Sequence, residues 1–312
     1  MKAYFFDKRR KPGLLSLRET AKPEPRDGEA LVRIRAVSVN AADWRSMRLG
    51  LAPKKGVYGA DISGVVEAAG PGVPFAAGDE VVADLSSSGF GGFAEYVAAP
   101  AAALARKPAG LSHEECAAVP MAAVSALQAL RDLGRIQAGQ KVLVVGASGG
   151  VGSFAVQLAK LSGAVVTGAC GAGNAELALG LGAERVIGHS RAELDAEAGY
   201  DLVLAVHGDH PPSLYRRMLR PGGTAVVVGG ALRQVFAAML LSPFLSLGAR
   251  KVRLLAARPS AADLGFILGL LAEGGLKAGI ERVYGFSELP QALDYAGGGH
   301  ARGKLVVRTD IA

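Results

Sequence analysis

The period of the hydrophobic positions changes within one short stretch near the middle of the chain. Residues 142–145 form a continuous aliphatic run, which is typical of a parallel strand covered on both faces. From Val151 to Leu158 the apolar residues recur at helical spacing instead. Residues 146–150, between them, are glycine, alanine and serine. Such a loop alone would also fit a purely structural turn, but the strand before it and the helix after it predict a dinucleotide-binding loop.

A loop with so few side chains lets its backbone approach a diphosphate closely. The unpaired N–H groups and the positive dipole end of the following helix then face the anion. We assign the following residues of this stretch to the cofactor: Ala147, Ser148, Gly149, Gly150, Val151 and Gly152.

On the N-terminal side the pattern is one of short strands separated by glycine and proline turns, which predicts an antiparallel β-domain. The predicted strands of this domain are residues 3–6, 30–39, 62–69, 80–83 and 93–97. Strand signals return near the C-terminus, at residues 282–284 and 304–308.

Between these regions strand and helix signals alternate, starting at Ser112, which with Glu115 has the spacing of a capping box. The predicted strands are residues 142–145, 165–168, 185–187, 202–205, 224–228 and 252–256, with helices around 152–161, 174–181, 213–219 and 261–273. This is the pattern of a six-stranded doubly wound parallel sheet. We therefore expect a β-domain of residues 1–113, completed by residues 278–312, with an inserted nucleotide domain of residues 114–277.

The longest uncharged stretch, residues 235–249, contains Pro243 and is too short to span a bilayer comfortably. We interpret it as a pair of packing helices; a wall of the substrate pocket is the functional alternative. The edge strand 252–256 after it would end an open sheet, and bare edges invite pairing, so we expect a homodimer.

Composition narrows the class of partner. Half of the 312 residues are hydrophobic, and the net charge of +7 is not gathered into a dense basic block. The most basic cluster, residues 8–11, is interpreted as a solvated hairpin turn. We expect anionic small molecules, and neither nucleic acid nor a membrane, as partners. Cys116 and Cys170 are the only cysteines and no signal peptide is visible, so we expect a reducing, cytoplasmic location.

Several short segments, taken in order, resemble the medium-chain dehydrogenase/reductase superfamily, and within it the zinc-free quinone-oxidoreductase-like branch. They are Ser38–Trp44, Tyr58–Val66, Gly78–Val82, Gly91–Val97, the glycine loop, Leu181–Ala183, Leu219–Gly223 and Gly303–Val307. The resemblance covers nearly the whole chain. It implies a GroES-like antiparallel β-domain with an inserted Rossmann domain.

The resemblance also makes two absences informative. Zinc-dependent relatives place a cysteine where this chain has Asn40 and a Gly-His-Glu where it has Gly59-Ala60-Asp61. Their four-cysteine lobe would lie around residues 85–92, where this chain has no cysteine. We therefore expect no metal. Hydride addition to a conjugated acceptor delocalises its own charge, so reduction of a quinone or an α,β-unsaturated carbonyl compound is the chemistry implied.

Asn40 and Asp43 match the Asn-x-x-Asp pattern that this branch places beside the nicotinamide, and we assign them as catalytic. A polar pair that caps a strand end and a short helix is the structural alternative, and both roles could hold. We place Trp44, Met47 and Met121 in the substrate pocket. His207 follows the fourth strand of the nucleotide domain, where ligands gather, and could donate a hydrogen bond or a proton.

The choice of cofactor rests on the end of the second strand of the nucleotide domain. NAD enzymes of this fold hold the ribose with a carboxylate there, whereas residues 168–174 contain none. We expect NADPH rather than NADH. His189 and Arg191 are the nearest basic candidates for the 2′-phosphate, and ordinary surface residues are the alternative. Four more positions complete the cofactor set: Gly171, Asn174, Gly229 and Lys304.

Together these observations predict a zinc-independent, NADPH-dependent quinone or enone oxidoreductase. Two alternatives stay open at this point. One is a carbonyl or alcohol dehydrogenase that works without metal. The other is a nicotinamide-binding structural or redox-sensing protein without turnover.

Overall fold

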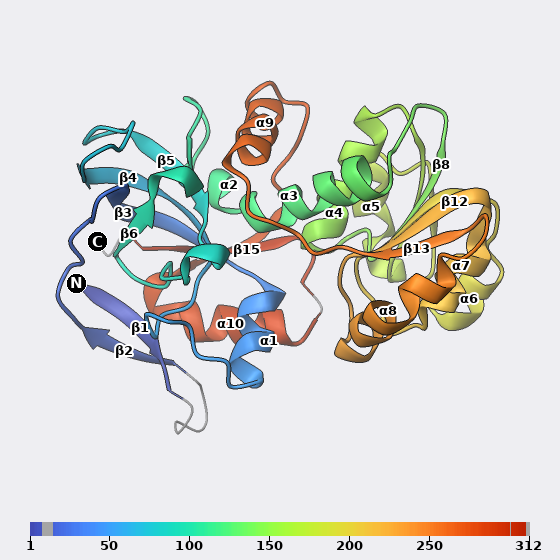
Figure 1. The fold of residues 1–312 in the computed structure, drawn as a ribbon, viewed down its shortest axis with the longest axis horizontal. Helices are drawn as coiled ribbons and strands as arrows, with labels where there is room; N and C mark the ends of the chain where they lie inside the picture. Colours follow the sequence, from blue (N-terminus) through green and yellow to red (C-terminus); the bar gives the residue numbers. More distant parts are fainter. Residues whose placement is uncertain (8–14, 300, 310–312) are drawn as a thin grey trace. The chain divides into compact units, whose positions relative to one another are not determined.

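The computed structural model describes residues 1–7, 15–299 and 301–309, so the basic turn expected at residues 8–11 lies outside the described residues. The chain forms two compact units (Figure 1). Unit 1 is Met1–Val124 with Arg258–Ala312, and unit 2 is Ser125–Ala257. In this division α2 (His113–Ala117) stays with unit 1, because it packs on strands of that unit's sheet. For the same reason α9 (Ala261–Ala272) also belongs to unit 1.

A seven-stranded sheet forms the centre of unit 1. Its order is β14-β15-β3-β4-β5-β7, and β6 also pairs with β3. The strands are β3 (Glu29–Val39), β4 (Asp61–Ala69), β5 (Glu80–Asp84), β6 (Tyr96–Pro100), β7 (Leu104–Arg106), β14 (Ile280–Gly285) and β15 (Lys304–Arg308). A separate antiparallel pair joins β1 (Lys2–Phe6) to β2 (Leu15–Glu19).

The prediction of a purely antiparallel domain needs one correction. β14 runs parallel to β15, because a helix, α10 (Leu289–Gly297), lies between them in the chain and allows a crossover connection. The other strand pairs of this sheet are antiparallel, as expected. The sequence pattern missed β2, β7 and α10.

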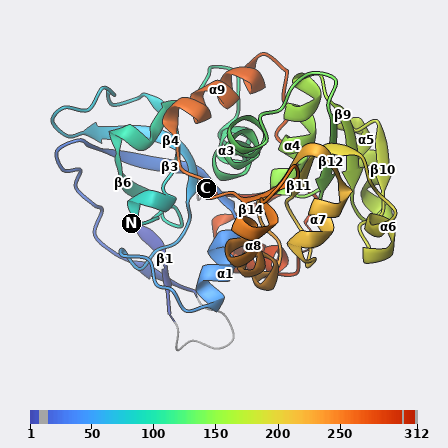
Figure 2. The ribbon, with the colours of Figure 1, turned by 45° about the vertical axis from the view of Figure 1, so that its right-hand side comes forward.

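The sheet of unit 2 has six parallel strands in the order β10-β9-β8-β11-β12-β13, which confirms the doubly wound prediction (Figure 2). The strands are β8 (Lys141–Val145), β9 (Val165–Ala169), β10 (Arg185–Ile187), β11 (Tyr200–Ala205), β12 (Leu219–Val227) and β13 (Lys251–Leu254). The helices are α4 (Gly150–Leu161), α5 (Ala175–Gly180), α6 (Arg191–Asp195), α7 (Pro212–Met218) and α8 (Leu232–Leu245). The strand order reverses between β8 and β11, which is where ligands bind in open sheets of this kind.

The pair of helices expected over residues 235–249 is wrong: α8 is one helix that continues through Pro243. A proline inside a helix removes one main-chain hydrogen bond, and here the helix still extends two residues beyond it, to Leu245. β13 does form the open edge of the sheet, as expected, and it carries Lys251 and Arg253. The edge-paired homodimer stays a prediction, and charged side chains on an edge strand oppose such pairing.

Candidate functional site

In unit 2 the glycine loop lies directly after β8. Gly146 has a φ of +89°, a left-handed conformation that favours glycine, and Gly149 caps α4. A Cβ built on Gly152 would lie 1.9 Å from the carbonyl oxygen of Gly146, so only glycine lets the helix start so close to the loop. The first main-chain N–H groups of α4 have no partner within the helix. The loop therefore fits a diphosphate at the positive end of α4.

The other assigned residues of unit 2 surround this loop. Ala147 and Ser148 are buried, and the Ser148 hydroxyl accepts a hydrogen bond from Asn174 Nδ2 at 3.1 Å. This bond ties the segment after β9 to the glycine loop. The main-chain N–H of His207 donates to Val145 O at 3.1 Å, and a Cβ on Gly146 would meet the His207 Cβ. The structure thus brings the end of β11 against the glycine loop.

A cavity of about 490 Å³ opens at the ends of β9 and β10. Its lining includes Gly171 and His189, two of the predicted cofactor residues. Arg191 does not line it; its Nε is 2.9 Å from Asp195 Oδ2, four residues along α6. Gly229 lies elsewhere, where its carbonyl oxygen accepts a hydrogen bond from Gln234 Nε2 at 2.7 Å.

The same cavity contains a carboxylate that the sequence interpretation missed. Glu193 lines it, and Glu193 Oε2 accepts hydrogen bonds from the hydroxyl and the main-chain N–H of Ser190. These bonds lower the pKa of Glu193, so the group is charged near neutral pH. The Ser-x-x-Glu spacing of a capping box was the signal that could have identified it.

In unit 1 the residue pair Asn40 and Asp43 forms a capping box at the start of α1 (Ala41–Arg48). The N–H of Asn40 donates to Asp43 Oδ2 at 2.9 Å, and the N–H of Gly59 donates to Asp43 Oδ1 at 3.3 Å. Both carboxylate oxygens of Asp43 therefore hold main-chain groups. Burial raises the pKa of Asp43 to about 7, and the charge of Asp61 adds to the rise.

The side chain of Asn40 belongs to a second, fully buried network around Asp61. Asp61 Oδ2 accepts from Asn40 Nδ2 at 2.9 Å and from Ser38 Oγ at 3.0 Å, and Asp61 Oδ1 accepts from the N–H of Met121 at 3.0 Å. The ammonium group of Lys304 donates to Asn40 Oδ1 and lies 3.5 Å from Asp61 Oδ2. Lys304, assigned from the sequence to the cofactor, thus lies in this polar cluster of unit 1.

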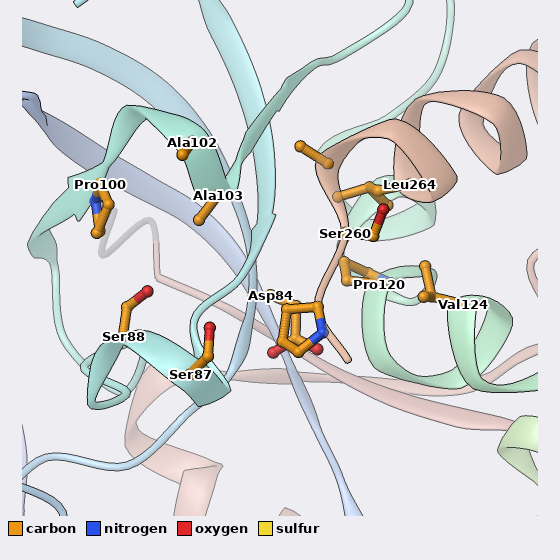
Figure 3. A pocket seen from close by; sticks show the side chains of 12 residues that line it. Asp84, Ser87, Ser88, Pro100, Ala102, Ala103, Pro120, Val124, Ser260 and Leu264 are labelled. Atoms are coloured by element: carbon orange, nitrogen blue, oxygen red, sulfur yellow. The ribbon is translucent and has the colours of Figure 1, made fainter. Parts of the chain in front are cut away.

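Asp84 lies opposite Asp61 in the antiparallel ladder of β4 and β5. Burial, and then the charge of Asp61, raise the pKa of Asp84 to about 6. Asp84 also lines a cavity of about 150 Å³ in unit 1, with Ser87 and Ser88 on one side and Ser260 on the other (Figure 3).

The three residues predicted for a substrate pocket do not line that cavity. Met47 is buried in the hydrophobic core of unit 1, with Trp44 packed against that core. Trp44 lies against α10, since a Cβ on Gly297 would meet its Nε1. Met121 contributes its main-chain N–H to Asp61, as described above.

These features are those of a two-unit protein in which one unit carries a glycine-loop nucleotide site and the other a buried polar cluster. Two family models match the chain, "Alcohol dehydrogenase GroES-like domain" over residues 26–109 and "Zinc-binding dehydrogenase" over residues 181–307. A chloroplast envelope quinone oxidoreductase homolog of Arabidopsis thaliana is 33% identical over 91% of this chain and 91% of its own length.

Solved structures agree. The quinone oxidoreductase from Coxiella burnetii has a TM-score of 0.87 and 27% identity, covering 99% of both chains. A quinone oxidoreductase of Escherichia coli has a TM-score of 0.86 at 23% identity, covering 99% of this chain and 100% of its own, which shows the shared fold. The chain belongs to the medium-chain dehydrogenase/reductase family and is quinone-oxidoreductase-like. Its relatives support an NAD(P)H-dependent oxidoreductase.

The contact between Gly146 and Gly152 generates a first prediction. Gly152→Ala introduces a Cβ that must displace the Gly146 carbonyl, so we expect cofactor affinity to fall more than tenfold, ~1.4 kcal/mol. The free energy of unfolding should fall by about 2 kcal/mol. Gly180→Ala, at the end of α5 where a Cβ meets nothing within 4 Å, is the matched control. Cofactor fluorescence titration measures the affinity, and urea unfolding measures the free energy of unfolding. Equal cofactor affinities for the two variants would contradict this account of the loop.

The pair Asp61 and Asp84 generates a second prediction. The folded pKa of Asp84, about 6, lies above its ordinary value of 3.8, so the folded protein binds the proton more tightly than the unfolded chain. Its contribution to stability is therefore present below pH ~4 and is lost as pH rises through ~6. Between pH 4 and 7.5 the free energy of unfolding should fall less in Asp84→Asn than in the wild type. The difference should be up to about 3 kcal/mol, because a pKa shift of about two units corresponds to that energy. Urea unfolding of both proteins from pH 4 to 7.5 checks it; parallel curves would refute it.

Proposed function

We propose that this protein is a zinc-independent, NADPH-dependent oxidoreductase that transfers hydride to a quinone or an α,β-unsaturated carbonyl compound. The observation that carries the proposal is the buried ammonium group of Lys304, set between Asn40 Oδ1 and Asp61 Oδ2. In zinc-dependent members, by the resemblance described above, metal ligands stand at the places of Asn40 and Ala60. Here a fixed positive charge already neutralises the neighbouring carboxylate, and it would repel a second cation.

The side chains at the positions of the zinc ligands also argue against a bound metal. An amide and a methyl group replace the thiolate and imidazole that zinc prefers. Without a Lewis acid, oxidation of a simple alcohol is hard, whereas a conjugated acceptor spreads the incoming charge over several atoms. When bound, the reduced nicotinamide supplies the hydride. The chain's own residues bind the diphosphate at α4, hold the acceptor beside polar groups and keep a positive charge near them.

Within this proposal Asn40 and Asp43 have different tasks. Asp43 has both oxygens engaged with main-chain N–H groups and is fully buried, so it positions the start of α1. Asn40 is proposed to act on the acceptor, and Lys304, which donates to Asn40 Oδ1, is proposed to position it. His207, held against Gly146, is proposed to donate a hydrogen bond at the nicotinamide end of the cofactor.

The direct test is oxidation of NADPH by a panel of quinones, enals and enones, with and without a chelator. We expect turnover that is indifferent to chelation. Asn40→Ala should lower kcat more than tenfold, ~1.4 kcal/mol of transition-state stabilisation, and leave NADPH affinity within about tenfold.

Ser38→Ala is the matched control, because it removes a different hydrogen bond to Asp61 and leaves Asn40 in place. If both variants lose turnover equally, the cluster is structural. Reversible oxidation of an alcohol would favour a metal-free alcohol dehydrogenase, and tight binding without any turnover would favour the binding-protein alternative. Stoichiometric zinc, or rescue of chelated enzyme by zinc, would refute metal independence.

NADPH is proposed because no carboxylate ends β9 and because His189 lines the neighbouring cavity. The Escherichia coli neighbour was solved in complex with NADPH, which agrees with this choice. Glu193 disfavours NADPH, because its negative charge lies in the same cavity and would repel a 2′-phosphate there.

The two residues give opposite predictions for the 2′-phosphate. His189→Ala should weaken NADPH binding, and Glu193→Gln should strengthen it, each by about two- to fivefold as expected for one exposed polar group, with NADH affinity unchanged. Arg191→Ala is the control, because that guanidinium pairs with Asp195. Nicotinamide fluorescence titration measures the dissociation constants of both cofactors for each variant. Wild-type affinity for NADH equal to or above that for NADPH would overturn the choice of cofactor.

Two further expectations stay predictions. The homodimer through the edge of β13 is untested, and so is a cytoplasmic location; the Arabidopsis thaliana relative is named for the chloroplast envelope. No helix within the described ranges is long and apolar enough to cross a membrane.

A further inference from the structure

Two loops of unit 2 follow the neighbouring strands β11 and β12. We call residues 206–211 the β11 loop and residues 228–231 the β12 loop. In the order β10-β9-β8-β11-β12-β13, the cavity with His189 lies at β9 and β10, on one side of β8, and these two loops lie on the other side. A dinucleotide with its adenosine half in the cavity and its diphosphate at α4 therefore extends its nicotinamide towards them.

Gln234, in the first turn of α8, connects the two loops. Its side chain is 1% exposed. Oε1 accepts a hydrogen bond from the main-chain N–H of His210, in the β11 loop, at 2.9 Å. Nε2 donates to the carbonyl oxygen of Gly229, in the β12 loop, at 2.7 Å. The hydroxyl of Tyr215, on α7, donates to the same Oε1 at 2.8 Å. One buried amide thus joins both loops and a helix of unit 2.

These partners determine the orientation of the Gln234 amide. A main-chain N–H can only donate and a carbonyl oxygen can only accept, so Oε1 faces His210 and Nε2 faces Gly229. Burial raises the pKa of Tyr215, so its hydroxyl stays protonated and donates. A carboxylate here would satisfy His210 and Tyr215 but would place an oxygen against the Gly229 carbonyl. A hydrocarbon side chain would satisfy none of the three, whereas an amide satisfies all of them.

The two loops also contact each other directly beside Gln234. The N–H of Ala231 donates to the carbonyl oxygen of Gly208 at 2.8 Å. Gly230 has a φ of +104°, and a Cβ built on it would collide with Gln234 Nε2 and with Gly208 O. The absence of a side chain at Gly230 therefore lets the amide and the β11 loop approach the β12 loop closely.

We propose that Gln234 is a positioning residue for the nicotinamide end of the dinucleotide, an inference that rests on the proposed function. It acts through the main chain of the two loops. The β11 loop carries His207, and the β12 loop carries Gly229, both of which are assigned to the cofactor site. The Gln234 amide holds these two loops at one separation, as groups that support a binding site must do.

The test compares two ligands by isothermal titration calorimetry near pH 8. One is NADPH, and the other is adenosine 2′,5′-bisphosphate, which has the adenosine half and the 2′-phosphate but no nicotinamide. In Gln234→Glu an oxygen replaces the donor that faces Gly229, while the acceptor for His210 stays. We expect this variant to bind NADPH about tenfold or more weakly than the wild type, and adenosine 2′,5′-bisphosphate within about twofold of it.

Tyr215→Phe is the matched control. It removes one hydrogen bond to the same Oε1 and leaves both loops bonded to Gln234, so both ligands should bind within about twofold of the wild type. Gln234→Met has a side chain of similar length with neither the donor nor the acceptor. If the glutamate variant fails to fold, Gln234→Met carries the same comparison, and we expect from it the same selective loss of NADPH affinity.

Three outcomes would overturn the proposal. The first is wild-type affinity for NADPH in Gln234→Glu. The second is equal weakening of both ligands, because Gln234 would then only maintain the fold of unit 2. The third is a loss of NADPH affinity in Tyr215→Phe as large as that in Gln234→Glu. The readout is the affinity for a cofactor and for one part of it, so failure of the proposed reduction of quinones or enones would leave this result unaffected.

Discussion

A buried pair of opposite charges joins distant parts of unit 1. Lys304 lies on the last strand and Asp61 on β4, and both side chains are almost completely removed from water. A buried carboxylate without partners is costly, whereas one that accepts several hydrogen bonds beside an ammonium group is tolerated. The bonds to Asp61 come from the end of β3, from the start of α3 (Pro120–Gln128) and from β15. The arrangement of the polar cluster therefore depends on the C-terminal strand returning to the N-terminal sheet.

The same pair sets the electrostatics of the cluster. One lysine faces three buried carboxyl groups, Asp43, Asp61 and Asp84, and the two that are not paired with it have raised pKa values. In unit 2 the constraint is steric instead, because the approach of Gly152 to Gly146 leaves no room for a side chain.

The nucleotide half was largely predictable from the sequence. β8, the glycine loop and α4 are contiguous, so local patterns indicated their type and order, and the strand order follows the usual rule for alternating strands and helices. Elements with weaker local signals were missed: the N-cap residue of α10, Glu288, makes no side-chain capping bond to that helix, and β14 runs parallel to β15 only because of that helix. Residues 235–249 were wrongly predicted to form two helices, because Pro243 suggested a helix break. In the structure α8 continues through Pro243.

Residue type and short spacing were enough to identify the glycine loop and the capping box of Asn40 and Asp43. Which side chains meet became known only from the folded chain. Folding brings Lys304 to Asn40, places Glu193 in the cavity beside His189, and joins the loops after β11 and β12 through Gln234. These results depend on how separate segments pack against one another. The hydrophobic periodicity within one segment does not determine which residues of other segments its side chains contact.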